Sequence, residues 1–239
     1  SIEGYGGAIA IEDVEDVLIT NTIFAENIAT TNGGGWYLYD VQDAMIRNNT
    51  FLANEAADGG AGYFSSASGD LINNIFAYSS GSTIYSSSAI SATYNDWYQN
   101  SGTNSGGSSS FSTSSNGNIS DDPELQSYSQ DGDFTNDNWN IATTSALVDA
   151  GDPSYSDLDG TRSDIGAYGG SGLLDQDLDG VGGLSDCDDN DPNAYPGAAP
   201  NDSTLECMTD ADSDGYGDDS PTNSNVIAGT DCDDSNPLI

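Results

Sequence analysis

Alternating aspartates occur twice near the C-terminal end of the chain. The segments DQDLDG at 175–180 and DADSDG at 210–215 each place carboxylates at positions 1, 3 and 5 and a glycine at position 6. A calcium ion takes about six to eight oxygen ligands, alternate residues are able to turn toward one ion, and glycine permits the sharp bend between them. The spacing therefore predicts two calcium-binding loops.

A second acidic motif follows each loop, DCDDNDP at 186–192 and DCDDSNP at 231–237. Side-chain oxygens alternate there too, so one carboxylate is able to bridge two ions. In the second repeat position 12 is Pro221, which offers no side-chain ligand, and Asp231 is expected to close the loop after a ten-residue insertion. The predicted metal ligands are Asp175, Asp177, Asp179, Val181 (through its carbonyl), Asp186, Asp188 and Asn190 in the first repeat, and Asp210, Asp212, Asp214, Tyr216, Asp218, Asp231 and Asp233 in the second.

The residue types favour Ca²⁺ over other metals. The chain has no histidine, and Cys187, Cys207 and Cys232 lie 20 and 25 residues apart, far from the CxxC spacing of zinc sites. Two unit charges 4 Å apart repel by about 1 kcal/mol even in bulk water, so such loops need a divalent partner to stay compact. We expect the tail to be ordered with calcium and disordered without it, the alternative being a solvated acidic linker.

The cysteine count leaves one thiol without an obvious partner. A Cys187–Cys207 disulfide is expected, with Cys232 pairing outside this segment, and free buried thiols are the alternative. An odd number of cysteines and motifs that are still repeating at residue 239 suggest a piece of a longer secreted protein.

Charge excludes several classes of function. The 239 residues include 40 acidic residues, two arginines, no lysine and no histidine, with a formal charge of -38. Such a chain does not attract a phosphate backbone, so nucleic acid is not an expected partner. Histidine-dependent catalysis and lysine Schiff bases are excluded, and no apolar run of about 18 residues predicts a membrane span. A calcium-rich exterior suits this charge, which predicts an extracellular or cell-surface location.

Upstream of these loops, four segments repeat one another: 6–27, 33–54, 60–78 and 90–100. Each contains short stretches of alternating apolar and polar residues between Gly or Asn turns, and none buries its apolar face alone. Stacking them buries that face and pairs the strands in parallel, at about 4.8 Å per layer. Two columns of like residues are predicted, an aromatic one of Phe24, Phe51, Phe76 and Trp97, and one at a turn of Asn21, Asn48 and Asn73. Asn95 is a further candidate for the second column.

Short motifs in these segments resemble known families. GGAI at 6–9, FAEN at 24–27 and FLAN at 51–54 resemble the repeats of polymorphic outer-membrane proteins, and more widely the right-handed parallel β-helix group that includes pectate lyases. Residues 121–126 and 146–170 resemble the closing segment of bacterial secreted β-helix proteins. The acidic tail is similar to thrombospondin type 3 repeats and to bacterial metal-binding repeats of the form DxDxDG…DCDDxDPxxxPGA. These resemblances imply a surface location and bound calcium.

The expected architecture is all-β. Residues 1–170 are predicted to form a right-handed parallel β-helix (solenoid), and residues 171–239 an Asp-rich calcium-binding tail that lacks regular secondary structure and continues beyond the fragment. The segment 101–120 is rich in Ser and Gly and has little to bury, so it is predicted to be a loop hanging off the helix.

The first functional hypothesis is a structural or adhesive surface protein without catalysis. In it the β-helix is a stiff rod, and the calcium repeats are a spacer. Solvent-facing Trp36, Tyr37 and Tyr39 would contact a glycan or another surface partner. The open sheet edge of a terminal coil would allow a homo-oligomer or filament.

The second hypothesis is a calcium-dependent polysaccharide lyase or glycoside hydrolase. β-Helices commonly act on acidic glycans, and the candidate residues are Arg47 with Asp40 and Asp43. A groove for a polyuronate should be basic, and this chain has almost no positive charge, so we expect no enzyme and assign no catalytic residue.

Overall fold

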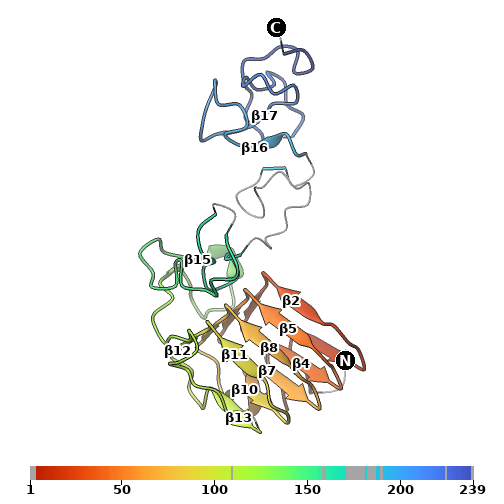
Figure 1. Cartoon of the computed structure of the whole chain (residues 1–239), viewed down its shortest axis with the longest axis vertical. Helices are drawn as coiled ribbons and strands as arrows, with labels where there is room; N and C mark the ends of the chain where they lie inside the picture. Colours follow the sequence, from red (N-terminus) through yellow and green to blue (C-terminus); the bar gives the residue numbers. More distant parts are fainter. Residues whose placement is uncertain are drawn as a thin grey trace. The chain divides into compact units, whose positions relative to one another are not determined.

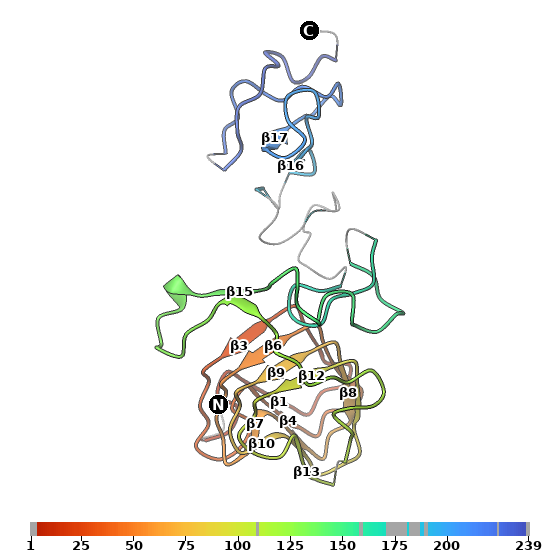
Figure 2. The same cartoon turned by 90° about the vertical axis from the view of Figure 1, so that its left-hand side faces the viewer.

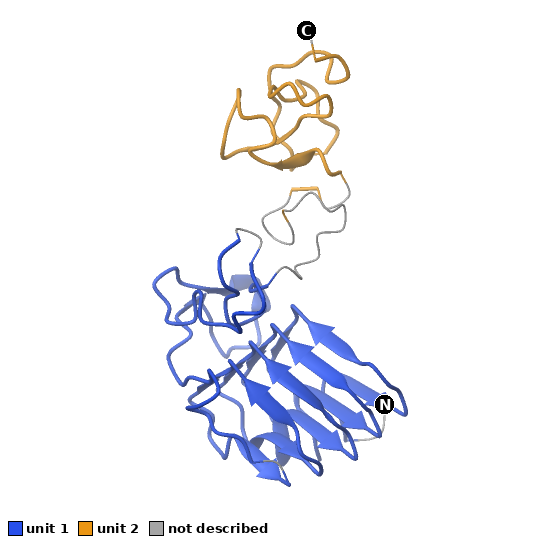
Figure 3. Ribbon diagram, in the orientation of Figure 1, with its two compact units in different colours: residues 1–171 blue, residues 172–239 orange. Residues whose placement is uncertain are grey.

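A computed structural model describes residues 4–108, 110–157, 160–170, 181, 187–188, 191–223 and 225–237. Its chain divides into two compact units, residues 1–171 and 172–239 (Figure 3). The fold is all-β, and the first unit is a parallel β-solenoid, which confirms the predicted fold class.

Three parallel sheets form the walls of the solenoid, and each of four coils adds one strand to each sheet, while β13 extends the first sheet alone (Figures 1 and 2). All pairings inside these sheets are parallel, as stacking of the repeats requires. The first sheet has the order β1 (Ile9–Glu12), β4 (Trp36–Tyr39), β7 (Asp58–Ser65), β10 (Ser82–Ser86) and β13 (Ser105–Gly107). The second has the order β11 (Ser91–Thr93), β8 (Gly69–Ile72), β5 (Ala44–Arg47) and β2 (Leu18–Thr20), and the third β12 (Asp96–Tyr98), β9 (Ile75–Ala77), β6 (Thr50–Leu52) and β3 (Ile23–Ala25).

The predicted aromatic column runs through the core. Ring centroids are 4.8 Å apart from Phe24 to Phe51, 5.0 Å from Phe51 to Phe76 and 4.5 Å from Phe76 to Trp97, with all three pairs stacked. This spacing equals one strand-to-strand step, so each ring covers the one in the next coil.

One expected solvent-facing side chain lies in the core instead. Trp36 is 0% exposed and packs against Phe51, because alternate residues of β4 point inward. Tyr37 points the other way but is only 7% exposed, since the Tyr63 ring stacks on it. Of the three aromatics, Tyr39 alone is well exposed, at 43%.

Two asparagine columns run side by side where the second sheet turns into the third. Asn21, Asn48 and Asn73 have φ of 47°, 51° and 56°, the left-handed turn that the sequence predicts for them. The neighbouring column is a buried ladder of Asn49, Asn74, Asn95 and Asn118, in which each backbone N–H donates to the side-chain oxygen one coil further on, at 2.9–3.0 Å. Assigning Asn95 to the first column was therefore wrong, because Tyr94 holds the left-handed position in its coil.

The segment 101–120 differs from the loop expected there. Its strand β13 pairs with β10, and the Phe111 ring lies 4.8 Å from that of Trp97. Asn118 ends the buried ladder, and Ile119 forms a parallel bridge with Asp96. A few well-placed side chains thus add a partial fifth layer despite the Ser/Gly-rich composition.

The segment that follows covers the outer face of the third sheet. Its hairpin of β14 (Leu125–Ser127) and β15 (Asn138–Ile141), with the 3-10 turn η1 (Phe134–Asn136) between them, is antiparallel. Leu147 and Ile165 pack on Leu52, Ile75 and Ala77 in a second apolar cluster. Side chains of the left-handed asparagines tie the segment down, since Asn21 donates to the carbonyl of Ala167 and Asn48 to that of Asp164.

Regular structure is sparse in the described part of the second unit. Strands β16 (Ala194–Pro196) and β17 (Cys207–Thr209) form a short antiparallel pair. The Cys187–Cys207 disulfide is present, as predicted, and Cys232 is free and exposed. Among the described residues of both units, no helix is long and apolar enough to cross a membrane.

Candidate metal centre

The second acidic loop begins where β17 ends. Asp210 is 7% exposed, and its carboxylate accepts hydrogen bonds from the backbone N–H groups of Ser213 (2.8 Å), Asp214 (3.2 Å) and Gly215 (2.9 Å). Gly215 has φ of 93°, which favours glycine at this bend. The first and last positions of the DxDxDG motif therefore fold the loop around one buried carboxylate.

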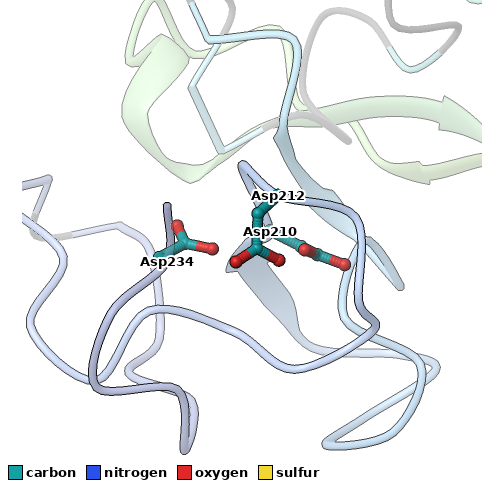
Figure 4. A group of neighbouring side chains, drawn as sticks. All are labelled: Asp210, Asp212 and Asp234. Atoms are coloured by element: carbon teal, nitrogen blue, oxygen red, sulfur yellow. The ribbon is translucent and has the colours of Figure 1, made fainter. Parts of the chain in front are cut away.

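Five carboxylates converge on this loop. Asp210, Asp212 and Asp234 form one triad, in which one oxygen from each lies within 4.8 Å of the others (Figure 4). Asp212 also belongs to a second triad with Asp214 and Asp231. Both arginines of the chain belong to the first unit, so no positively charged side chain of the second unit neutralises this cluster.

Asp231 is the most enclosed member of the cluster. It is 2% exposed, and its Oδ1 accepts a hydrogen bond from the backbone N–H of Asp233 at 2.9 Å. Its Oδ2 is buried and has no hydrogen-bond partner among the residues that the structure describes, and the same holds for Oδ2 of Asp212. A buried carboxylate oxygen without a partner is costly, and a cation coordinated between the triads would satisfy both oxygens.

The electrostatics of the cluster favour a bound positive charge. Burial and the neighbouring carboxylate of Asp214 raise the pKa of Asp212, with smaller contributions from Asp231 and Asp210. Burial likewise raises the pKa of Asp234, although a hydrogen bond from the backbone of Ala211 opposes the shift. Protons and cations therefore compete for these two carboxylates.

Asp231 reaches the loop because the chain folds back after Asp218. The two residues form a parallel bridge, and the backbone N–H of Asp231 donates to the carbonyl of Gly217 at 2.8 Å. Asp202 holds the returning chain, since it accepts hydrogen bonds from the backbone N–H groups of both Gly217 and Thr230 at 2.9 Å. These contacts thus bring Asp231, the predicted closing ligand, beside Asp212 and Asp214.

Sequence reasoning missed Asp234. Its carboxylate accepts a hydrogen bond from the backbone N–H of Ala211 at 2.9 Å, which sets it beside the loop. Alternation of oxygens through DCDDSNP predicts Asp233 in its place, but the Asp233 carboxylate accepts from the Ser235 hydroxyl at 2.7 Å and belongs to neither triad. The doubled aspartate of the motif is the only sequence signal for Asp234.

The other predicted ligands lie at or outside the edge of the cluster. Tyr216 is 44% exposed, and its backbone N–H donates to Asp214 at 2.9 Å, while the Asp218 carboxylate accepts from the backbone of Ser220. In the first repeat, Oδ2 of Asp188 accepts a hydrogen bond from Nδ2 of Asn223 at 2.8 Å. Val181 is also among the residues that the structure describes, and it interacts with another residue. Asp175, Asp177, Asp179, Asp186 and Asn190 lie outside the described residues.

The donor set fits a hard divalent cation. Every side chain of the two triads is a carboxylate, which calcium prefers, and backbone carbonyls and water would complete the shell. A soft metal lacks a matching ligand set, because the chain has no histidine and the Cys187–Cys207 disulfide leaves Cys232 as its single remaining thiol.

The residues considered for catalysis are not gathered in one groove. Asp43 lines a groove of about 410 Å³ with Asp70 and Ser68. Arg47 does not line it, and its guanidinium lies 4.4 Å from the centroid of the Tyr155 ring. Asp40 occupies a left-handed turn after β4, with φ of 49°.

The fold and the acidic cluster define a class of protein, a parallel β-solenoid joined to a carboxylate-rich loop unit. No family model, curated protein or solved structure matches the chain.

Proposed function

We propose that this chain is a structural or adhesive part of a secreted or cell-surface protein, in which the second unit binds calcium and the solenoid is a rigid rod without catalytic activity. The observation that carries the proposal is the convergence of five carboxylates on one loop, with Asp231 buried and one of its oxygens without a partner in the described part of the chain. Membership of the polymorphic outer-membrane and thrombospondin type 3 groups is part of the same proposal.

Calcium supplies what the second unit lacks. Without a cation, mutual repulsion of the carboxylates opposes the compact loop, and no side chain of this unit compensates. When the free concentration of a ligand is about 100 times its Kd, and the ligand binds only the folded state, it adds about 2.7 kcal/mol to the free energy of unfolding. A disulfide and a charge of -38 suit an oxidising, calcium-rich exterior.

The stacked coils would make the first unit a stiff rod. Its ring column and asparagine ladder join every coil to the next, and β1, β2 and β3 are edge strands that would allow end-to-end association into a homo-oligomer or filament. Of Trp36, Tyr37 and Tyr39, the exposed Tyr39 is the one that remains available to a glycan or surface partner.

The test of calcium binding is a titration of the whole chain, followed by calorimetry and by limited proteolysis of the second unit. Calcium is expected to bind and to protect residues 191–237 from cleavage. Asp212→Asn, which removes the carboxylate shared by both triads, should weaken binding at least tenfold. Asp133→Asn, at an exposed aspartate of the first unit, is the control. Unchanged heat and unchanged proteolysis of the wild-type chain at millimolar calcium would refute the proposal.

A polysaccharide-active enzyme is the alternative function. Its test is a lyase and hydrolase assay on acidic polysaccharides with and without calcium. Turnover that is lost in Asp43→Asn would support the enzyme and contradict the proposal of a purely structural rod.

A further inference from the structure

A polar groove of about 480 Å³ lies beside the acidic loop of the second unit. The described residues that line it include Asp210, Asp214, Asn193, Tyr195 and Asn201. Asp210 belongs to one carboxylate triad and Asp214 to the other, so the groove borders both candidate cation positions. Its volume falls within the range of small-molecule sites, about 300–1,000 Å³.

Hydrogen bonds fix the lining of the groove to the acidic loop. Nδ2 of Asn201 donates to the carbonyl of Asp214 at 3.1 Å, and its backbone N–H donates to the carbonyl of Gly215 at 2.8 Å. The backbone N–H of Asp210 donates to the carbonyl of Asn193 at 3.0 Å. The groove is therefore preformed, which lowers the entropy lost when a ligand binds in it.

A cation in the second triad would keep coordination positions open toward the groove. The triad brings three carboxylates together, whereas calcium takes about six to eight oxygens. Asp231 points to a cation independently of the number of acidic residues, because its Oδ2 is buried and has no hydrogen-bond partner among the described residues. Hydroxyl oxygens of a ligand are hard neutral donors that are able to replace water on such a cation.

Tyr195 adds an aromatic side chain to this polar lining. It lies in β16, is half-buried and lines the groove. A tyrosine ring is able to pack on the apolar C–H face of a sugar ring, while the carboxylates of the lining accept hydrogen bonds from its hydroxyl groups. The groove thus combines the groups that suit a saccharide.

The charge of the cluster favours a neutral ligand. Five carboxylates converge there, and one calcium ion neutralises only two of their charges. An anionic ligand would still be repelled, and a cationic ligand would compete with calcium for the same carboxylates. A neutral polyol meets neither obstacle.

We infer that this groove binds a neutral saccharide, in which two neighbouring hydroxyl groups coordinate the calcium ion of the second triad while the ring packs on Tyr195. The inference rests on the proposed function, because it requires calcium in the second unit. Coupling between the two ligands is reciprocal, so the saccharide should raise the affinity of the chain for calcium.

The test is saturation-transfer NMR of the whole chain with the methyl glycosides of mannose and galactose, in millimolar calcium and in a chelator. Transfer to at least one glycoside is expected in calcium, with none in the chelator. The fully O-methylated glycosides, which have no hydroxyl group, should show no transfer. Transfer that persists in the chelator would mean that calcium does not bridge protein and sugar, and would overturn the inference.

Tyr195→Ala separates sugar binding from calcium binding. It should lower the affinity for the glycoside about tenfold and leave calcium affinity in the absence of sugar unchanged, because Tyr195 belongs to neither triad. Leu205→Ala is the control, since Leu205 is 84% exposed in the same unit and does not line the groove. Unchanged glycoside affinity in folded Tyr195→Ala would contradict the inference.

A measurement on wild type decides the matter if Tyr195→Ala fails to fold. In calcium, the glycoside should shift the backbone amide resonances of Ser213 and Gly215, both of which line the groove. Shifts confined to other parts of the chain would place the sugar elsewhere and overturn the inference.

Methyl glucuronide and a lysine oligomer provide the anionic and cationic comparisons. If either binds this groove more tightly than the neutral glycosides do, the groove takes a charged ligand and the inference is wrong. Calcium binding without glycoside binding overturns this inference alone, whereas absence of calcium binding in wild type overturns the proposed function as well.

Discussion

Asp96 is a carboxyl group inside the first unit rather than on its surface. It is 0% exposed in β12, its Oδ1 accepts from the backbone N–H of Asp121 at 3.0 Å, and its Oδ2 has no hydrogen-bond partner in the described ranges. Burial raises the pKa of Asp96 to about 8, assisted by the charges of Asp121 and Asp122 and opposed by hydrogen bonds from the backbone of Asp121 and Trp97. Near neutral pH the folded protein therefore keeps this group protonated.

A pH dependence of stability follows from Asp96. Its pKa is about 8 in the folded state and about 3.9 in an unfolded chain, so the folded state binds more protons between these values. The contribution of Asp96 to the free energy of unfolding should be greatest below pH 4 and fall as the pH rises toward 8, by at most about 1.4 kcal/mol per pH unit. Chemical denaturation of the first unit from pH 4 to 9 measures this slope.

The matched variant is Asp96→Asn, which is neutral at every pH and keeps an acceptor for Asp121. It should equal wild type near pH 4 and be more stable near pH 8, whereas Glu12→Gln, at an exposed glutamate of the first unit, should follow the wild-type curve. A wild-type slope that persists in Asp96→Asn would show that another group is responsible.

At the scale of elements, side-chain ladders join the coils where backbone pairing ends. A second ladder runs through Asn27, Asn54, Ser79 and Asn100, in which Asn54 accepts from the backbone N–H of Asn27 and donates to the carbonyl of Phe24. Ser79 interrupts it, since this residue is fully buried and its hydroxyl has no partner within the described segments. The coil that contains Ser79 therefore lacks the pair of side-chain hydrogen bonds that Asn54 makes to its preceding coil.

Replacing Ser79 by asparagine should restore the ladder. The new amide would accept from the backbone N–H of Asn54 and donate toward the carbonyl of Phe51, and the variant should gain about 1 kcal/mol in free energy of unfolding. Asn54→Ser is the reciprocal change and should lose a comparable amount or more. Urea denaturation of both variants checks the pair, and a destabilised Ser79→Asn would mean that the pocket is too small for the amide.

At the scale of the molecule, the two units are held together internally by different means. The solenoid has two apolar clusters and stacked rings, whereas the described part of the second unit has a short strand pair, a disulfide and the acidic cluster. Acid should therefore act on the units in opposite directions, releasing the cation from the raised-pKa carboxylates Asp212 and Asp234 while the solenoid gains stability through Asp96.

The disulfide provides a test of whether the two units are stabilised independently of each other. Cys187 and Cys207 are 20 residues apart, and opening a loop of this size is expected to cost about 3 kcal/mol. The double variant Cys187→Ser/Cys207→Ser should weaken calcium binding and lower the melting transition of the second unit, with the transition of the solenoid unchanged. Scanning calorimetry resolves the two transitions, and a shift of both would contradict independent stabilisation.

Spacing in the sequence was sufficient to predict the stacked parallel coils and the ring column, because a short repeat with an apolar face has few ways to bury it. It was also sufficient to place Asp210, Asp212 and Asp214 on one loop, since alternation of carboxylates is local. Asn95 was misassigned because the second and third coils each carry a pair of asparagines, Asn48–Asn49 and Asn73–Asn74, and a drift of one residue is invisible until the strands are in register.

Local sequence thus determined the repeat, the loop and the carboxylates of its alternating motif. Only the tertiary structure decided that Trp36 faces inward, that Asp234 rather than Asp233 joins the cluster, and that Asn223 reaches Asp188. The physical reason is that these outcomes depend on where a returning chain crosses an earlier one, and that path is set by burial, a disulfide and hydrogen bonds between residues far apart in sequence.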